Sequence, residues 1–184
     1  LAAQAALATH LSTLLARLEP QCLGLYSAVR SEFNAMVALA NDPTTAGLPL
    51  ALPFSRRVPR AMHYRAWDGG PLRSLDECGI PACEGAEVVP DVVLAPCVGF
   101  TRSGYRLGYG GGYFDRWLAA HPHVTAIGVA WAGAEVDEAG FGNYADKVIK
   151  IERRVLGVLH DLRATVTVGV VEEDDGGGLD ERLA

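Results

Sequence analysis

The stretch that most constrains this chain is Gly104–Arg116, which holds five glycines, three tyrosines, two arginines and one aspartate in thirteen residues. Glycine loses more backbone entropy on folding than any other residue, so this density is typical of positive-φ turns or of close backbone approach to a ligand. Apolar residues at positions 113, 114, 117 and 118 follow helical spacing. The sequence therefore predicts a glycine loop that leads into a helix, with backbone N–H groups directed at an anion and above all at phosphate.

Two well-known phosphate motifs do not fit this stretch. A Walker loop ends in Gly-Lys-Ser/Thr, and no lysine lies between Arg106 and Arg116. The last glycine of a dinucleotide-binding fingerprint would fall on Tyr113 or Asp115. The residues alone therefore indicate another kind of phosphate loop, with Arg106 and Arg116 as charge partners and Asp115 as a candidate Mg²⁺ ligand. The alternative is a glycine-rich surface turn.

Composition narrows the class of protein. A length of 184 residues suits one domain, which we expect over residues 1–171, followed by an acidic, glycine-rich tail over 172–184. The formal charge of −6 argues against general nucleic-acid binding, and no apolar run approaches the ~20 residues of a membrane span. The four cysteines form no C-x-x-C pair, and no signal peptide is evident. These features predict a reduced, cytoplasmic protein.

Hydrophobic periodicity predicts an α/β fold. A leucine stripe predicts a helix over 7–18, and a second helix is expected through Met36 and Leu39. The expected strands cover residues 23–27, 48–54, 61–67, 91–96, 126–131 and 165–171. The strand over 91–96 leads directly into the glycine loop, and α/β sheets bind ligands at the carboxyl ends of their strands.

The run Pro96-Cys97-Val98-Gly99-Phe100, followed by Gly104–Arg116, resembles the signature of the 5-formyltetrahydrofolate cyclo-ligase family, also called methenyltetrahydrofolate synthetase. The resemblance implies a three-layer α/β/α fold with a mostly parallel, Rossmann-like sheet. It also implies an ATP- and Mg²⁺-dependent enzyme that closes 5-formyltetrahydrofolate to 5,10-methenyltetrahydrofolate and releases ADP and phosphate through a phosphorylated formyl intermediate. We expect a monomer or weak homodimer that accepts the folate with or without a polyglutamate tail.

The resemblance also implies roles for particular residues. Arg106 and Tyr113 would take part in catalysis. ATP would be bound by Arg106, Leu107, Gly108, Tyr109, Gly110, Gly111, Gly112, Tyr113 and Phe114. The folate would contact Ser27, Glu32 and the segment from Tyr109 to Tyr113. Asp115 and Asp146 would bind Mg²⁺, with Asp161 as a competitor for the second position.

Several alternatives remain open from the sequence. Glu32 could instead be a first-turn helix acid, and Ser27 could be purely structural. Met62 and Trp67 suit either the core or a pterin pocket. The arginines of the region suit a solvated face or an anion site; they are Arg56, Arg57, Arg60 and Arg65.

Two departures from the family pattern support a different reading. Ala82-Cys83 stands where the family commonly has Glu-Pro, and the basic segment that precedes the first helix in the family is not seen in this sequence. The alternatives are a relative that binds nucleotide or folate without turnover, and an unrelated phosphate-ester enzyme of the same layered class.

Overall fold

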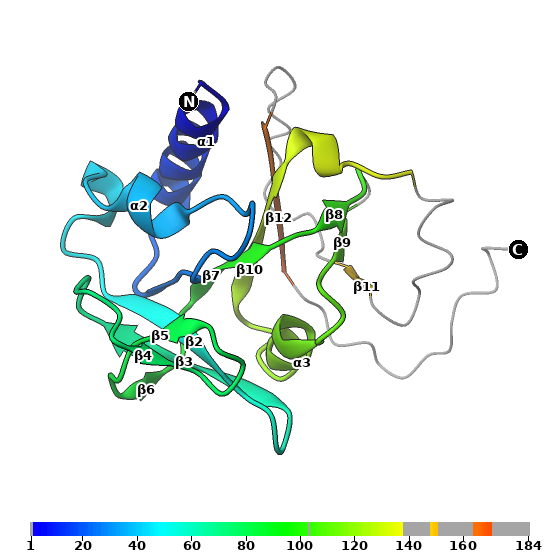
Figure 1. The fold of residues 1–184 in the computed structure, drawn as a ribbon. Helices are drawn as coiled ribbons and strands as arrows, with labels where there is room; N and C mark the ends of the chain where they lie inside the picture. Colours follow the sequence, from blue (N-terminus) through cyan, green and yellow to red (C-terminus); the bar gives the residue numbers. More distant parts are fainter. Residues whose placement is uncertain (1, 103, 138–147, 151–163, 171–184) are drawn as a thin grey trace, which may run out of the picture.

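A computed structural model describes residues 2–102, 104–137, 148–150 and 164–170 (Figure 1). Its helices are α1 (Ala2–Leu18), α2 (Ala35–Leu39) and α3 (Tyr113–Ala119), with 3-10 turns at Pro43–Thr45 and Ala132–Ala134. Its strands are β1 (Leu23–Gly24), β2 (Leu50–Arg56), β3 (Ala61–Trp67), β4 (Ser74–Leu75), β5 (Pro81–Ala82), β6 (Glu87–Val88), β7 (Val92–Pro96), β8 (Gly99–Phe100), β9 (Tyr105–Leu107), β10 (Thr125–Trp131), β11 (Val148–Lys150) and β12 (Ala164–Val170).

The main sheet has seven strands in the order β12-β10-β7-β1-β2-β3-β6. Its centre is parallel, because β1 pairs in parallel with β2 and β7, and β7 pairs in parallel with β10. The outer strands β12, β3 and β6 are antiparallel to their neighbours. The strand order reverses at β1, which has β2 on one side and the much later β7 on the other. Such a switch point opens a ligand crevice at the carboxyl ends of the strands.

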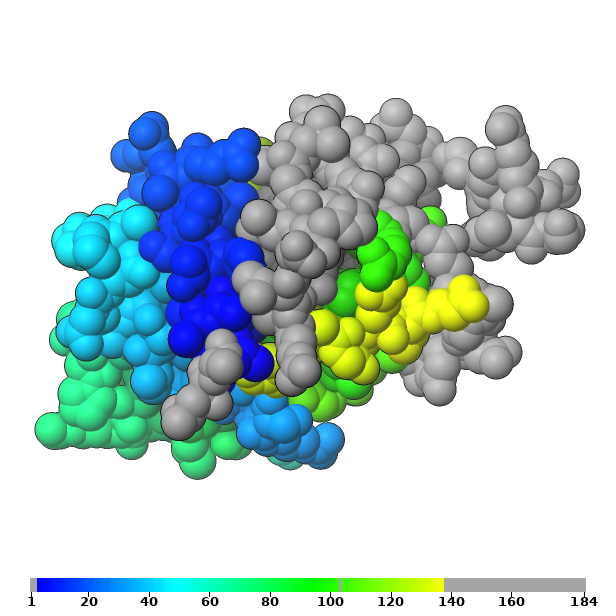
Figure 2. Space-filling model, turned by 90° about the horizontal axis from the view of Figure 1, so that it is seen from above, coloured from blue at the N-terminus to red at the C-terminus, as the bar shows by residue number. Residues whose placement is uncertain are grey.

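Helices cover both faces of this sheet (Figure 1). On one face, three leucines of α1 are buried with the alternate strand residues Leu52, Leu94 and Ile127. Figure 2 shows α1 in dark blue lying across this side of the molecule. On the other face, Trp117 and Leu118 of α3 are buried against the intervening strand residues, among them Ala51 and Val93. The two-residue period of the strands thus supplies two cores, and the expected α/β/α layering is confirmed.

Strand β1 is shorter than the predicted 23–27, and β2 has the predicted length but lies two residues later than the predicted 48–54. The chain leaves the sheet after β1 because the next side chains bond to loops: the Tyr26 hydroxyl donates to the Phe33 carbonyl at 2.7 Å. Strand β2 was expected to close on Pro53, yet it continues to Arg56. The carbonyls of Pro49 and Ala51 accept the N–H groups of Leu23 in β1 and of Leu25 just after it. Pro53 therefore faces the same side at a point beyond β1, where its missing N–H breaks no strand pairing.

Two small sheets were not predicted from the sequence. One is the hairpin of β4 and β5, and the other joins β8, β9 and β11. The β4–β5 hairpin contacts the glycine loop through Cys78, and β9 of the three-stranded sheet carries Arg106. No described helix is long and apolar enough to cross a bilayer. The single-domain boundary at residue 171 stays a prediction, because residues 171–184 lie outside the described part of the chain.

Candidate functional site

Arg106 and Asp115 form the polar centre of the site. Arg106, on β9, is only 4% exposed, and its guanidinium donates a hydrogen bond to the Asp115 carboxylate in the first turn of α3. The Phe114 ring lies 5.6 Å from the same guanidinium. Among the described residues, the buried Nε of Arg106 has no hydrogen-bond partner. Because a buried donor without a partner is costly, this N–H is suited to an anionic ligand.

The glycine loop takes backbone conformations that other residues adopt poorly. Gly110 has a φ of 81°, and Gly112, the N-cap of α3, has a φ of 61°. A Cβ on Gly112 would lie 2.8 Å from Nη1 of Arg116, whose Nη2 donates to the Gly111 carbonyl at 2.8 Å. The prediction of a glycine loop that leads into a helix is confirmed. Helix α3 has seven residues, and the full charges at this place belong to Arg106, Asp115 and Arg116.

A second loop, residues 26–34, meets the glycine loop through Glu32 and Tyr109. The Glu32 carboxylate accepts a hydrogen bond from the Val29 N–H at 2.8 Å and another from the Tyr109 hydroxyl. The Arg30 guanidinium lies 5.4 Å from the Tyr109 ring. Partial burial raises the pKa of Glu32 above its ordinary value, against the opposing effects of these hydrogen bonds and of Arg30. Two segments that the resemblance assigns to the folate therefore lie in contact.

Glu32 is not the first-turn acid that the alternative reading required. Helix α2 begins at Ala35 and has no acid in its first turn; its cap is Asn34, whose side chain accepts the Val37 N–H at 3.2 Å. Glu32 therefore projects from the loop ahead of the helix. Its role in binding the folate stays a prediction.

Ser27 has a structural contact. Its side chain is 7% exposed, and its hydroxyl donates to the Pro81 carbonyl at 2.6 Å. This bond joins the end of β1 to β5. Ser27 lies at the start of the loop that carries Glu32, and its contribution to a folate pocket stays a prediction.

The loop over 26–34 is also tied to the end of β10. The Trp131 indole donates to the Ser31 carbonyl at 2.7 Å, and its ring meets Phe33 edge-on at 5.8 Å. Burial raises the pKa of Cys97, which follows β7, and Arg106 is the first of the influences that oppose this rise. The carboxyl ends of β1, β7 and β10 thus meet around the loop and Arg106, at the switch point of the sheet.

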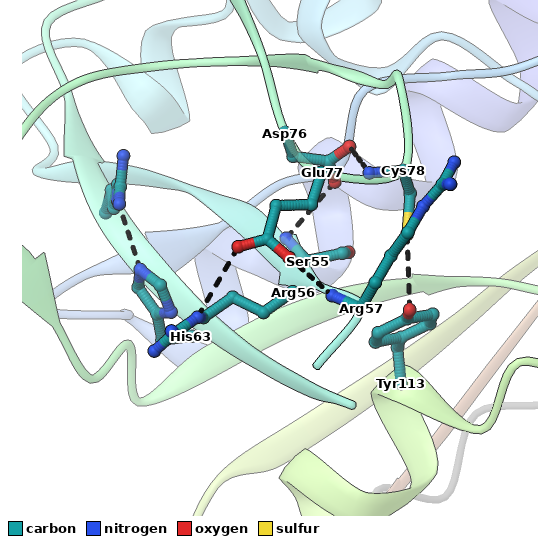
Figure 3. A network of polar contacts seen from close by, with 9 residues as sticks. Ser55, Arg56, Arg57, His63, Asp76, Glu77, Cys78 and Tyr113 are labelled. Carbon is teal, nitrogen blue, oxygen red and sulfur yellow. Dashed lines mark hydrogen bonds and ion pairs between the residues drawn. The ribbon is translucent and has the colours of Figure 1, made fainter. Parts of the chain in front are cut away.

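Tyr113, the first residue of α3, makes a contact that the sequence did not predict (Figure 3). The Cys78 thiol donates to the Tyr113 hydroxyl oxygen at 3.2 Å. The Arg116 guanidinium lies 5.6 Å from the Tyr113 ring. An aspartate followed three residues later by glycine, as in Asp76 and Gly79, is typical of a turn. That signal predicts the turn but not its contact with Tyr113.

The arginines between β2 and β3 are partly engaged with neighbours. Arg56 lies 3.6 Å from Glu77, at the surface. Arg65 donates to the His63 ring at 3.0 Å and stacks 3.7 Å from the Phe54 ring. These two arginines fit the solvated-face alternative better than an anion site.

Met62 is a core residue, and Trp67 lies apart from the glycine loop. Met62 is buried in the core beneath α3. The Trp67 indole donates to the Gly70 carbonyl at 2.9 Å and lines a cavity of about 470 Å³ together with Leu72 and Cys83. Since Trp67 pairs with Leu50 at the start of β2, this cavity lies near the amino end of the parallel strands.

The metal ligands expected from the resemblance are only partly within the described chain. Asp146 and its competitor Asp161 lie outside it. Within the described ranges, no group of three or more His, Cys, Asp or Glu could hold a metal. Mg²⁺ is commonly held by one or two carboxylates together with substrate phosphates. Asp115, with one oxygen bonded to Arg106, fits that arrangement beside a bound nucleotide.

The fold and the site define an α/β protein in which a glycine loop, a buried arginine and a carboxylate-bearing loop meet at the switch point of the sheet. Residues 77–138 match the sequence profile of the 5-formyltetrahydrofolate cyclo-ligase family. The resemblance that the sequence indicated is therefore confirmed over the region that contains the glycine loop.

Two solved structures share the fold. The 5,10-methenyltetrahydrofolate synthetase of Aquifex aeolicus aligns with a TM-score of 0.57 and 23% identity, covering 95% of this chain and 82% of that one. The 5,10-methenyltetrahydrofolate synthetase of Mycoplasma pneumoniae aligns with a TM-score of 0.52 and 21% identity, covering 71% and 73%. At these identities the likeness shows the fold.

The matches to curated proteins cover only a short part of this chain and of each relative. A sulfoacetaldehyde dehydrogenase (acylating) of Bilophila wadsworthia is 43% identical over 44 residues, which cover 24% of this chain and 10% of that protein. A sulfoacetaldehyde dehydrogenase of an Acholeplasma species is 51% identical over 43 residues, covering 23% and 9%. This chain thus spans about a tenth of the length of these curated relatives.

Proposed function

We propose that this protein converts 5-formyltetrahydrofolate to 5,10-methenyltetrahydrofolate, with ATP cleaved to ADP and phosphate. The observation that carries the proposal is the contact between the Glu32 loop and the glycine loop, beside the buried Arg106. One loop is suited to phosphate and the other presents a carboxylate, so the crevice can bring two different ligands together. The family match over residues 77–138 supports the choice of these two ligands.

The chemistry must activate a formyl oxygen, which is a poor leaving group as part of an amide. We infer that this oxygen attacks the γ-phosphorus of ATP, forming a P–O bond as the bond to the ADP oxygen breaks. The folate N10 then adds to the activated carbon, the carbon–oxygen bond breaks, and phosphate leaves with its electron pair as N10 loses its proton. Such phosphoryl transfer requires positioning and charge neutralisation more than a protein nucleophile.

The residues of the crevice have matching roles in this proposal. Arg106 would neutralise charge that develops on the transferred phosphoryl group, with its orientation fixed by Asp115. The loop N–H groups from Leu107 to Phe114 would hold the phosphates. Tyr109 and Tyr113 would flank the folate, with Glu32 binding its pterin N–H groups.

Mg²⁺ is part of the proposal as the ion that neutralises phosphate charge. Asp115 is the described residue that would contribute a carboxylate to it. Binding of a polyglutamate tail, the oligomeric state and a cytoplasmic location stay predictions of the sequence.

A second candidate is a relative that binds nucleotide or folate without turnover. The observation that favours it is Ala82, which is 1% exposed at the position where the family commonly has glutamate. A buried alanine on β5 supplies no carboxylate to a ligand.

The test is a spectroscopic assay with the natural full-length protein. 5-Formyltetrahydrofolate, ATP and Mg²⁺ are mixed with the protein, and absorbance in the methenyl-folate band is followed together with ADP release. We expect equal amounts of the two products, and neither when ATP is omitted. Tight binding of both ligands by calorimetry without product would overturn the proposal in favour of the non-catalytic relative.

A further inference from the structure

The side chain of Asp76 organises a turn that ends against the glycine loop (Figure 3). Asp76 is 6% exposed. One of its carboxylate oxygens accepts the N–H groups of Cys78 and Ile80 at 2.8 and 2.9 Å, and the other accepts the Ser55 N–H at 3.1 Å. A carboxylate that accepts three backbone hydrogen bonds in a buried setting fixes the backbone around it.

This turn is also joined to the end of β2 by its main chain. The Glu77 N–H donates to the Ser55 carbonyl at 3.1 Å, and the Asp76 N–H donates to the Ile80 carbonyl at 2.8 Å. The turn therefore has one position relative to the carboxyl end of β2, which is a rigid part of the main sheet.

The turn fixes the position of Cys78, and Cys78 contacts the candidate site. Its thiol bonds to the Tyr113 hydroxyl, and Tyr113 joins the glycine loop to α3. Four residues further along the chain, α3 is also attached to the main sheet, because the Trp117 ring meets the Tyr64 ring of β3 edge-on, with 4.8 Å between the ring centroids. The Cys78 bond is thus a separate constraint, on the loop end of α3.

We propose that Asp76 is a positioning residue for the glycine loop and acts through the contact of Cys78 with Tyr113. This inference rests on the proposed function, which places Tyr113 at the ligands. Asp76 itself touches neither ligand, since its carboxylate is occupied by backbone N–H groups. Its effect on turnover comes from where it holds Cys78.

The first experiment does not depend on activity. Hydrogen exchange of the amides from Tyr109 to Phe114 is compared between the natural protein and three variants, Asp76→Asn, Cys78→Ala and Cys78→Ser. We expect faster exchange in Asp76→Asn and Cys78→Ala, because the loop loses one constraint. We expect near-natural exchange in Cys78→Ser, whose hydroxyl can bond to Tyr113. Unchanged exchange in Cys78→Ala would overturn the proposal.

The second experiment measures turnover in a double-mutant cycle. Loss of one neutral hydrogen bond predicts a kcat/KM about threefold to tenfold lower in Cys78→Ala, with recovery in Cys78→Ser. Asp76→Asn should lower kcat/KM at least as much, and the double variant Asp76→Asn/Cys78→Ala should be no worse than Asp76→Asn alone. Effects that multiply would overturn the proposal, because they would show that Asp76 does not act through Cys78.

The matched control is Glu77→Gln. It removes the same charge from the next residue, whose carboxylate also accepts a backbone N–H but lies at the surface. We expect natural exchange and turnover in this variant, and an equal loss would contradict the special role of Asp76. If Asp76→Asn does not fold, the two Cys78 variants still test the contact. Absence of turnover in the natural protein would remove the proposed function, while the exchange result would still report on the constraint.

Discussion

Arg106 and Asp115 form the most buried ion pair that the structure describes, with side-chain exposures of 5% and 20%. The other two described pairs, Arg56 with Glu77 and Arg102 with Glu135, have at least one side chain that is about half exposed or more. The pair joins β9 to α3 across the glycine loop. The two residues that the sequence marked for separate roles, one for phosphate and one for Mg²⁺, are therefore coupled.

Replacement of Arg106 by alanine should remove nearly all turnover. The variant loses the charge nearest the proposed phosphoryl group, so kcat/KM should fall about a hundredfold or more in the absorbance assay. It also leaves Asp115 unpaired in a mostly buried place, so the free energy of unfolding should fall by about 2–3 kcal/mol. Arg102→Ala is the control: its pair is exposed, and both quantities should stay close to natural. Natural kinetics in Arg106→Ala would remove this residue from the site.

Replacement of Asp115 by asparagine should raise the Mg²⁺ concentration needed for half-maximal turnover about tenfold, because one anionic ligand is lost. The asparagine carbonyl can still accept a bond from Arg106, so the loop keeps its support. Turnover is titrated with Mg²⁺ at saturating ATP, and Asp68→Asn at the surface serves as the control for a lost charge. An unaltered titration would indicate that Asp115 serves only to orient Arg106.

Replacement of Gly112 by alanine should destabilise the start of α3. An alanine with a φ of 61° costs about 1–2 kcal/mol, and Arg116 must move away from the new methyl group. Urea unfolding measures the change. Gly133→Ala is the matched control, because a Cβ there meets no atom within 4 Å. Equal stability of the two variants would show that the loop can relax around the side chain.

Replacement of Glu32 by glutamine should change how stability depends on pH. Burial raises the pKa of Glu32 above 4.5, so the folded protein binds this proton more tightly than the unfolded chain does. Glu32 therefore adds most to the free energy of unfolding below pH 4.5. This stabilisation is lost as the pH rises through the pKa of Glu32 in the folded state. Glu32→Gln should therefore gain stability relative to the natural protein as the pH rises above 4.5.

Urea unfolding at several pH values checks this expectation, with Glu84→Gln at the surface as the control. A stability difference that stays constant with pH, or that moves in the opposite direction, would contradict the raised pKa of Glu32.

The long strands and helices were predictable because each carries its own hydrophobic pattern. The apolar run that becomes β7 and the leucine stripe of α1 are examples. The two-residue strands were not, since two residues show no period and pair only because neighbouring chain segments hold them in place. Strand β1 is the exception, because the apolar run over 23–27 predicted a strand there, and only its length of two residues differs.

Within the site, the glycine loop and its helix were predictable from local composition, and the contacts of that loop were not. The bond from Tyr109 to Glu32 and the bond from Cys78 to Tyr113 join segments far apart in the sequence. Nothing local to Cys78 signals a partner on α3. Such contacts depend on the order of strands in the sheet, which periodicity does not specify.

The reversal of strand order at β1 has a consequence for biosynthesis. As the polypeptide leaves the ribosome, β1, β2 and β3 can pair early, but the other edge of β1 stays open until Val92–Pro96 emerges to fill it. The crevice is bordered by strands from both sides of that edge. A nascent chain that halts before β7 would hence carry four of the seven strands of the main sheet and neither the glycine loop nor Arg106.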